Sequence, residues 1–265
     1  MRVYKFFATV FNMTRDRPIF DEDPGLLQRS VSAFQKIAPF AVRNKDRFHS
    51  QFGQDILIAE VLFAGQAGFF LDVGARCGEI NSNSLALEKS YGWQGILVEP
   101  ERENFSDIVA ARKQPALNLA VSNTSGQLEF VSFTEERGHS KLRKLVPDEE
   151  LSRRTHEVYT VQVKPISIIM AQAPVTTVDY VDIDVEGEEV AAIEGMDFDA
   201  VRYRVVAVES NPARYRDIRA LMAARGYVPL CRLGVDVFFV AQSEYSDFCE
   251  LIEARNFIKR PLSRR

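Results

Sequence analysis

Two acidic residues in or directly after short apolar runs are the first candidates for chemistry in this sequence. Asp72 lies in the run at 69–73, and Glu99 follows a second run 27 residues later. A loop with glycines at 74 and 78 comes directly after the first run. Glycine lets the backbone approach a ligand closely, and a carboxylate at the tip of the second strand can accept both hydroxyls of a ribose. This arrangement predicts a mononucleotide-type cofactor, although the full G-x-G-x-x-G spacing is missing.

A second group of acids, Asp182, Asp184 and Glu186, alternates along a short segment. Residues two apart share one face of an extended strand, so these like charges would need solvent, a cation or a proton nearby. Two interpretations stay open. Either Asp184 lies at the opening of a site at the end of the strand, or Asp182 turns toward solvent and Glu188 and Glu189 lie at a helix N-terminus, where the dipole favours acids. No bound metal is predicted, but a divalent cation at Asp182, Asp184 and Glu209 is kept as an alternative, because hard cations prefer oxygen ligands.

Composition and charge narrow the class of protein. The chain has 265 residues, of which 46% are hydrophobic and 26% charged, so a globular protein with a sizeable core is expected. The formal net charge of −4 argues against nucleic acid as a partner. Three scattered cysteines without a C-x-x-C pair favour reduced thiols and a cytoplasmic location. No apolar run is long enough to predict stable insertion in a membrane.

The elements that must position these acids alternate between apolar runs and helical patterns, which is typical of a βαβ architecture. A helix is expected over 79–91, directly after the glycine loop. The last two apolar runs flank a Leu-Gly pair and predict a closing antiparallel hairpin. The expected parallel strands are 69–73, 95–98, 116–122, 178–183 and 205–208, and the hairpin strands are 226–232 and 235–240.

Three parts of the chain are expected. Residues 1–48, with one amphipathic helix over 25–37, form an N-terminal appendage that caps one mouth of the core. Residues 49–243 form the core, and 244–265 form a C-terminal helix with a basic tail. Within the core, the charged and non-periodic stretch 134–156 is predicted to be a lid-like loop, because such long loops in a compact domain are usually functional or disordered.

Six short blocks occur in an order that resembles the FkbM-type methyltransferases. Together they cover roughly residues 51–240: QFGQD at 51–55, FFLDVGA at 69–75, GILVEP at 95–100, LAVS at 119–122, DIDVEG at 182–187 and VESNP at 208–212. The resemblance implies a class I methyltransferase fold, which is a Rossmann-like, seven-stranded and mostly parallel α/β sheet with the C-terminal antiparallel hairpin. It also implies S-adenosyl-L-methionine as the cofactor and O-methylation of a hydroxyl on a small molecule, sugar or glycan as the activity.

The same resemblance implies which residues hold the cofactor. Asp72, Gly74 and Ala75 would hold its methionine and ribose end, and Glu99 the ribose hydroxyls. Gln51 and Asp55 would close over it, although Asp55 could instead serve as an acid at a helix N-terminus. The full expected set is Gln51, Asp55, Asp72, Gly74, Ala75, Glu99, Pro100, Ala120 and Val121.

Methyl transfer to a neutral alcohol also needs a base, because the acceptor must lose its proton. Asp184 is the first candidate, since it lies where the fourth strand ends. His139, in the lid-like loop, is the second candidate, although a lone loop histidine can equally be a solvated side chain. Two other functions stay open: an NAD-dependent oxidoreductase, against which the missing G-x-G-x-x-G argues, and a non-catalytic protein that binds S-adenosylmethionine.

Overall fold

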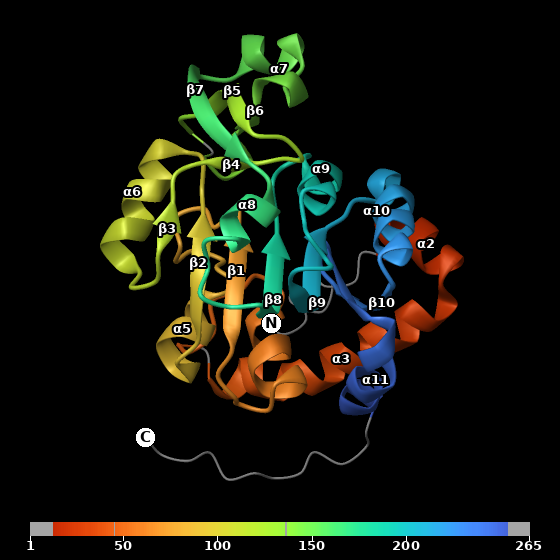
Figure 1. Ribbon diagram of the computed structural model, residues 1–265. Helices are drawn as coiled ribbons and strands as arrows, with labels where there is room; N and C mark the ends of the chain where they lie inside the picture. The colour runs from red at the N-terminus through yellow and green to blue at the C-terminus, as the bar shows by residue number, and fades with distance from the viewer. Residues whose placement is uncertain (1–12, 45, 136, 254–265) are drawn as a thin grey trace.

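A seven-stranded sheet lies at the centre of the computed structural model, which describes residues 13–44, 46–135 and 137–253 (Figure 1). Its strand order is β10-β11-β9-β8-β1-β2-β3. The five strands from β9 to β3 run parallel, and β11 pairs antiparallel with both β9 and β10. The strands are β1 (Phe69–Val73), β2 (Gln94–Val98), β3 (Ala116–Leu117), β8 (Thr177–Ile183), β9 (Arg202–Glu209), β10 (Tyr227–Leu233) and β11 (Asp236–Ala241).

This arrangement confirms the mixed α/β fold and the closing antiparallel hairpin that the sequence predicts. Strand β1 is buried along its whole length, as expected for a parallel strand covered on both faces. One core cluster joins the sheet to α8 (Ile166–Met170), α9 (Glu189–Glu194) and α10 (Pro212–Ala224). A second cluster joins its other face to α3 (Pro24–Arg43), the π-helix Leu57–Leu62, α5 (Leu85–Tyr91) and α11 (Tyr245–Glu253).

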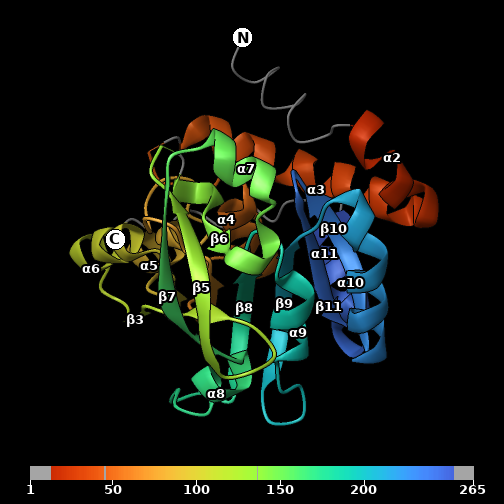
Figure 2. The ribbon, with the colours of Figure 1, turned by 90° about the horizontal axis from the view of Figure 1, so that it is seen from above.

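A second, four-stranded sheet lies over the carboxyl ends of the parallel strands (Figure 1), and the view in Figure 2 shows β5 and β7 side by side in it. Its order is β4-β7-β5-β6, with β4 (Ala120–Val121), β5 (Gly126–Phe133), β6 (Lys141–Leu142) and β7 (His156–Lys164). Alternating apolar and polar residues over 127–133 and 157–164 predict the two long strands of this sheet, but not that they form a sheet of their own.

The predicted strand 116–122 is wrong as a single element. Its first part, β3, pairs with β2 of the large sheet, whereas β4 pairs with β7 of the second sheet. Asn118, between the two, donates from Nδ2 to the carbonyls of Glu99 and Pro100 at 2.9 and 3.2 Å. These hydrogen bonds hold the chain at the point where it leaves one sheet for the other.

The stretch 134–156 is also different from the single loop that the sequence suggested. Its described residues include a 3-10 turn at Arg137–His139, strand β6, a second 3-10 turn at Arg143–Leu145 and helix α7 (Asp148–Arg153). Val131 and Phe133 of β5 pack against Val146, so one face of the second sheet has a small core of its own. Short elements of two to six residues leave no long periodic pattern in a sequence, which explains why the stretch looked like a loop.

The predicted helix 79–91 begins only at Leu85. Residues 74–84, called the glycine loop below, instead carry four left-handed backbone conformations, at Gly74, Arg76, Gly78 and Asn81, with φ of 91°, 52°, 74° and 59°. A helix cannot pass through such residues. Ser82 Oγ accepts the backbone N–H of Leu85 at 3.1 Å, which marks the actual helix start.

The N-terminal segment packs closely on the large sheet. Helix α2 (Met13–Glu22) precedes α3, and Leu26 and Phe34 of α3 are fully buried. Helix α3 is longer than the predicted 25–37 and begins at Pro24, where the Asp23 carboxylate accepts the N–H of Leu26. The remaining helices are α4 (Gln54–Ile56) and α6 (Arg102–Ala111). Residues 1–12 and the basic tail from 254 lie outside the described residues. In the described part, no helix has the length and apolarity that a membrane span requires.

Candidate active site

A cavity of about 670 Å³ lies where the parallel strands of the large sheet end, beneath the second sheet. Its volume falls in the range of small-molecule sites. The large sheet contributes residues at the ends of β1, β2, β8 and β9, and the second sheet contributes residues of β4, β5 and β6. Eight of the nine predicted cofactor residues line it: Gln51, Asp72, Gly74, Ala75, Glu99, Pro100, Ala120 and Val121.

Gly74 brings the ends of β1 and β8 into direct contact. A Cβ atom at this position would lie 1.7 Å from the carbonyl oxygen of Asp184, and the backbone φ is 91°. The N–H of Asp184 donates to the carbonyl of Val73 at 3.0 Å. Only glycine fits both the conformation and the space, so the backbone forms the cavity floor here without side-chain bulk.

Glu99 is 6% exposed and lies at the tip of β2. Its Oε2 accepts the N–H of Arg76 and its Oε1 accepts the N–H of Glu101, both at 2.8 Å. Burial raises the pKa of this carboxyl to about 8, and the hydrogen bonds oppose the rise. The carboxyl is therefore fixed in place by backbone donors from both sides while it faces the cavity.

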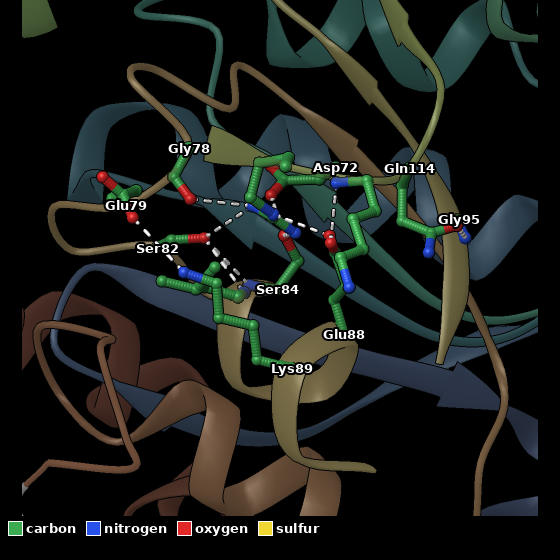
Figure 3. Close-up of polar contacts among 12 residues, drawn as sticks. Asp72, Gly78, Glu79, Ser82, Ser84, Glu88, Lys89, Gly95 and Gln114 are labelled. Carbon is green, nitrogen blue, oxygen red and sulfur yellow. Dashed lines mark hydrogen bonds and ion pairs between the residues drawn. The ribbon is translucent and has the colours of Figure 1, made fainter. Parts of the chain in front are cut away.

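Asp72 is buried in the middle of the site, next to Asp182 in the register of β1 and β8. The Ser84 hydroxyl donates to Asp72 Oδ2 at 2.5 Å, and Figure 3 shows this contact as part of a larger polar group. Asp182 accepts from Asn83 Nδ2 at 2.8 Å and from the Tyr180 hydroxyl at 3.0 Å. Burial raises the pKa of both carboxyls, and their mutual repulsion adds to the rise at Asp182.

Asp184 directly follows β8 and lies in the cavity wall with the other acids that the sequence grouped with it. Burial raises its pKa well above the usual range, and the neighbouring carboxylates Glu209, Asp236, Glu186 and Asp182 raise it further. Burial and the charge of Glu209 raise the pKa of Glu186 to about 7. The predicted acidic cluster therefore forms, although the strand ends at Ile183 and Glu186 lies in a left-handed turn with φ of 52°.

His139 reaches the same cavity from the second sheet. Its Nδ1 lies 3.7 Å from Glu186 Oε1, and its side chain is 59% exposed. A Cβ atom on the preceding Gly138 would lie 2.8 Å from the guanidinium of Arg76, so this turn rests on the glycine loop. The structure thus brings both candidate bases to one cavity, Asp184 from the end of β8 and His139 from the 3-10 turn before β6.

Asp55 is the one predicted cofactor residue that does not line the cavity. It is fully buried, and its carboxylate accepts the N–H groups of His49 and Ser50 at 2.7 and 3.1 Å. Burial raises its pKa against those hydrogen bonds. Its contacts are those of a residue that fixes the turn before α4, and Gln51 in that turn faces the cavity.

Several polar side chains of the site, among them Gln54, Asp236 and Asn83, were not found from the sequence. Gln54 Nε2 donates to Asp236 Oδ2 at 2.6 Å, and both residues line the cavity. They are 182 residues apart, so no local spacing could have connected them. Asn83, which holds Asp182, was read as part of a helix and not as part of a loop.

No cluster of three or more His, Cys, Asp or Glu side chains suited to a metal ion occurs among residues 13–44, 46–135 and 137–253. Asp182, Asp184 and Glu209, the alternative cation ligands, all line the cavity but do not form such a cluster. The three cysteines are free thiols.

Comparison with known proteins identifies the family to which this chain belongs. The model of the methyltransferase FkbM domain matches residues 72–229, more than half of the chain. No curated protein matches the chain. Among solved structures, the chain is similar to the crystal structure of methyltransferase FkbM from Methylobacillus flagellatus KT, with 13% sequence identity and a TM-score of 0.43. The match covers 80% of this chain and 59% of that one. On the strength of the domain match, the chain belongs to the family of FkbM-domain methyltransferases.

Proposed function

We propose that this protein is an S-adenosylmethionine-dependent O-methyltransferase of the class I fold that acts on a hydroxyl of a small molecule or sugar. One observation carries the proposal: the Gly74 turn, the Glu99 carboxyl and Asp184 all face one cavity at the carboxyl ends of neighbouring parallel strands. That edge of a parallel sheet is where α/β proteins bind their ligands. Membership of the FkbM-domain family supports methyl transfer as the reaction class.

The residues present fit the cofactor. A carboxylate offers about four lone-pair positions. Two of those on Glu99 are used by the N–H groups of Arg76 and Glu101 and a third by the Asn104 side chain, which leaves capacity for a hydrogen bond from a ribose hydroxyl. At Gly74 the backbone forms a cradle that any Cβ atom would fill. Ala120 and Val121, both buried, supply an apolar wall from the second sheet.

When bound, S-adenosylmethionine supplies a methyl group already activated by its sulfonium. The protein must then align the acceptor, exclude water and take the acceptor's proton. Asp184 is the proposed base, because its carboxylate lies in the cavity wall where β8 ends. Its raised pKa makes the ionised form a stronger base than an ordinary aspartate. Gly138 and His139 cover this side of the cavity from the second sheet.

The acceptor class follows from the polar character of the wall around Asp184. The cavity wall near Asp184 carries several carboxylate acceptors and one amide, which belong to Glu186, Glu209, Asp236 and Gln54. A polyhydroxylated acceptor such as a sugar can donate hydrogen bonds to these groups, whereas an apolar acceptor cannot. This supports a hydroxyl on a carbohydrate or similarly polar small molecule as the methyl acceptor.

Isothermal titration calorimetry with S-adenosylhomocysteine, NAD and NADP tests the cofactor. We expect S-adenosylhomocysteine to bind and the dinucleotides not to bind. At about pH 9, where Glu99 is mostly ionised, Glu99→Gln should weaken its binding by about 1.5–3 kcal/mol, since it removes a charged hydrogen-bond acceptor. Glu129→Gln, on an exposed part of β5, is the matched control and should bind like the wild type.

Tighter binding of NAD than of S-adenosylhomocysteine would support the oxidoreductase alternative and overturn the proposal. A labelled methyl donor offered with a panel of hydroxylated acceptors then identifies the substrate. Binding of S-adenosylhomocysteine without transfer to any acceptor in a broad panel would favour the non-catalytic alternative.

A further inference from the structure

Arg112 lies directly behind the glycine loop, on the side away from the cavity. It is the C-terminal cap of α6, where its N–H donates to the carbonyl of Ile108 at 2.9 Å. Its side chain is fully buried, and it forms an ion pair with Glu88 of α5 at 2.7 Å. Arg112 is not among the residues that line the cavity. A fully buried guanidinium is unusual unless its donors are satisfied, so its contacts show what it organises.

All side-chain donors of Arg112 with described partners point to the glycine loop or to the helix that follows it. Nη1 donates to the carbonyl of Gly78 at 2.8 Å and approaches the hydroxyl of Ser82 at 3.4 Å. Nη2 donates to the hydroxyl of Ser84 at 3.0 Å, and Nε donates to Glu88. In Figure 3 the labelled residues Asp72, Gly78, Ser82, Ser84 and Glu88 converge on this point, joined by dashed contacts.

Ser84 connects this group to the site. Its hydroxyl accepts from Arg112 and donates to Asp72 Oδ2, which lies in the cavity wall. A hydroxyl that accepts from a guanidinium becomes a better donor, so the two hydrogen bonds strengthen each other. The chain of contacts therefore runs from Arg112 through Ser84 to the acid at the end of β1.

The glycine loop needs such support, because its backbone conformations are not self-stabilising. Arg76 and Asn81 have left-handed φ values of 52° and 59°, which cost free energy for residues with a side chain. Ser82 and Asn83 of the loop face the cavity, as does Arg76. Movement of the loop would therefore move several cavity-lining groups at once.

We propose that Arg112 is a positioning residue that holds the glycine loop and Asp72 in the geometry that binds the cofactor, without contacting the cofactor itself. That the ligand is S-adenosylmethionine rests on the proposed function, whereas the claim that Arg112 holds the glycine loop applies to the protein without ligand. Arginine is required, because its planar group presents five donors in a fixed fork that reach Glu88, Gly78 and Ser84 together. A lysine ammonium at the same position has three donors on one atom and cannot span these three partners.

The test compares Arg112→Lys with Arg29→Lys in the full-length protein. Arg29 is the matched control: its side chain is 11% exposed, pairs with Asp23 and donates to the carbonyls of Pro229 and Leu230, away from the cavity. Arg112→Lys should raise the Kd for S-adenosylhomocysteine and the KM for the methyl donor by about 10-fold to 100-fold, with a smaller loss of kcat at saturation. Arg29→Lys should lower the melting temperature without changing either constant.

Two further measurements decide between positioning and general destabilisation. Amide exchange at Gly78 and Ser82 should accelerate in ligand-free Arg112→Lys but not in Arg29→Lys. Ser84→Ala, which tests the same chain of contacts if Arg112→Lys does not fold, should also weaken binding. Because both residues act through one chain of contacts, the double variant should lose no more affinity than the worse single variant.

Unchanged affinity in folded Arg112→Lys or in Ser84→Ala would overturn the inference, and so would additive losses in the double variant. If the wild type does not bind S-adenosylhomocysteine, the proposed function fails, and the exchange measurement alone then decides whether Arg112 holds the loop. Unchanged exchange at Gly78 and Ser82 in Arg112→Lys would overturn it in that case too.

Discussion

Asp184 lies among four other carboxylates, and this environment decides how it can act. Its N–H is fixed by the carbonyl of Val73, while its carboxyl faces the cavity with a pKa raised by burial and by Glu209, Asp236 and Glu186. Asp184→Asn keeps the shape but removes the basic oxygen. We expect methyl transfer to fall by about 10²–10⁴-fold, the usual range of general base catalysis, with little change in affinity for S-adenosylhomocysteine.

The control for this variant is Asp199→Asn, at an exposed position outside the cavity, which should leave turnover unchanged. Single-turnover rates at saturating cofactor give the comparison. Near-normal transfer by folded Asp184→Asn would remove it as the base, and His139 would then be the candidate. Loss of cofactor affinity together with melting temperature would show instead that Asp184 is structural.

The raised pKa of Glu99 predicts how cofactor binding depends on pH. In the free protein this carboxyl titrates near a pKa of about 8, so it is mostly protonated at pH 6 and mostly ionised at pH 9. Ribose hydroxyls donate to the ionised form, so binding lowers the pKa and releases a proton. The affinity for S-adenosylhomocysteine should therefore rise with pH until about pH 8 and then level off.

Calorimetry in buffers of different ionisation enthalpy measures this proton release directly. Glu99→Gln has no such carboxyl, so its weaker binding should not change over the same pH range. Affinity that falls as pH rises in the wild type would contradict the assignment of Glu99 to the ribose.

Individual site residues could be predicted where a strand end fixes them. Asp72, Glu99 and Asp184 each lie in or directly after an apolar run, and parallel strands bring such residues to one edge. Arg112, Gln54 and Asn83 were missed because their roles depend on contacts with residues 24 to 182 positions away. Asp55 is the opposite case, since its carboxylate accepts hydrogen bonds from its own turn and does not line the cavity.

At the scale of elements, the close contact between the chain after β1 and the chain after β8, at Gly74 and Asp184, predicts how glycine substitutions affect stability. Gly74 and Gly92 both have left-handed φ values, 91° and 71°, but differ in the space around them. A Cβ atom at Gly92 would meet nothing within 4 Å, whereas one at Gly74 would lie 1.7 Å from the Asp184 carbonyl. Gly92→Ala should cost about 1–2 kcal/mol for its conformation alone, and Gly74→Ala considerably more, because the two strand ends must separate.

Chemical denaturation of both variants gives the difference in the free energy of unfolding. Binding of S-adenosylhomocysteine should persist in Gly92→Ala and be lost in Gly74→Ala. Equal destabilisation by the two substitutions would mean that β1 and β8 can move apart at this point without cost.

The long elements of the large sheet were predictable, and the short ones were not. Strand β1 matches the expected 69–73, because a strand buried on both faces leaves a continuous apolar run. Strands β3 and β4 have two residues each, and the apolar character of 116–122 gave no sign that the chain changes sheets at 118–119. The predicted start of the helix over 79–91 was wrong. Arg76 and Asn81 adopt left-handed conformations, and their residue types give little indication of this.

At the scale of the whole molecule, a buried ion pair ties the N-terminal segment to the large sheet. Arg232 of β10 and Asp16 of α2 lie 3.2 Å apart, and both side chains are 1% exposed. Asp16→Ala would leave the guanidinium buried with one partner fewer, so we expect a loss of about 3–5 kcal/mol in the free energy of unfolding. Asp21→Ala in the same helix removes an ion pair with Arg17 that is mostly exposed, and should change stability little.

Urea denaturation of both variants measures this difference. The double variant Asp16→Ala/Arg232→Met removes both charges and should recover part of the loss. If Asp16→Ala were no worse than Asp21→Ala, the N-terminal helices would be an attachment that the core does not need. The sequence suggested such an appendage, because a pair 216 residues apart leaves no local pattern.

The chain connects the second sheet to the large sheet at only one end of the second sheet. Both chain connections to the large sheet, at residues 118–119 and from residue 165, leave at the end where β4 pairs with β7. The opposite end contacts the turn after β8 through side chains. Lys144 Nζ lies 2.6 Å from Glu188 Oε1, and His139 Nδ1 lies 3.7 Å from Glu186 Oε1. The chain itself therefore joins the two sheets at one end, whereas side-chain contacts hold the opposite end. These contacts include the buried hydrogen bond from Ser132 Oγ to Glu101 Oε1 at 3.1 Å and the partly exposed Lys144–Glu188 pair. Added salt screens the charges of Lys144 and Glu188, so we expect it to weaken this contact near Asp184 while the covalent connections hold the other end in place.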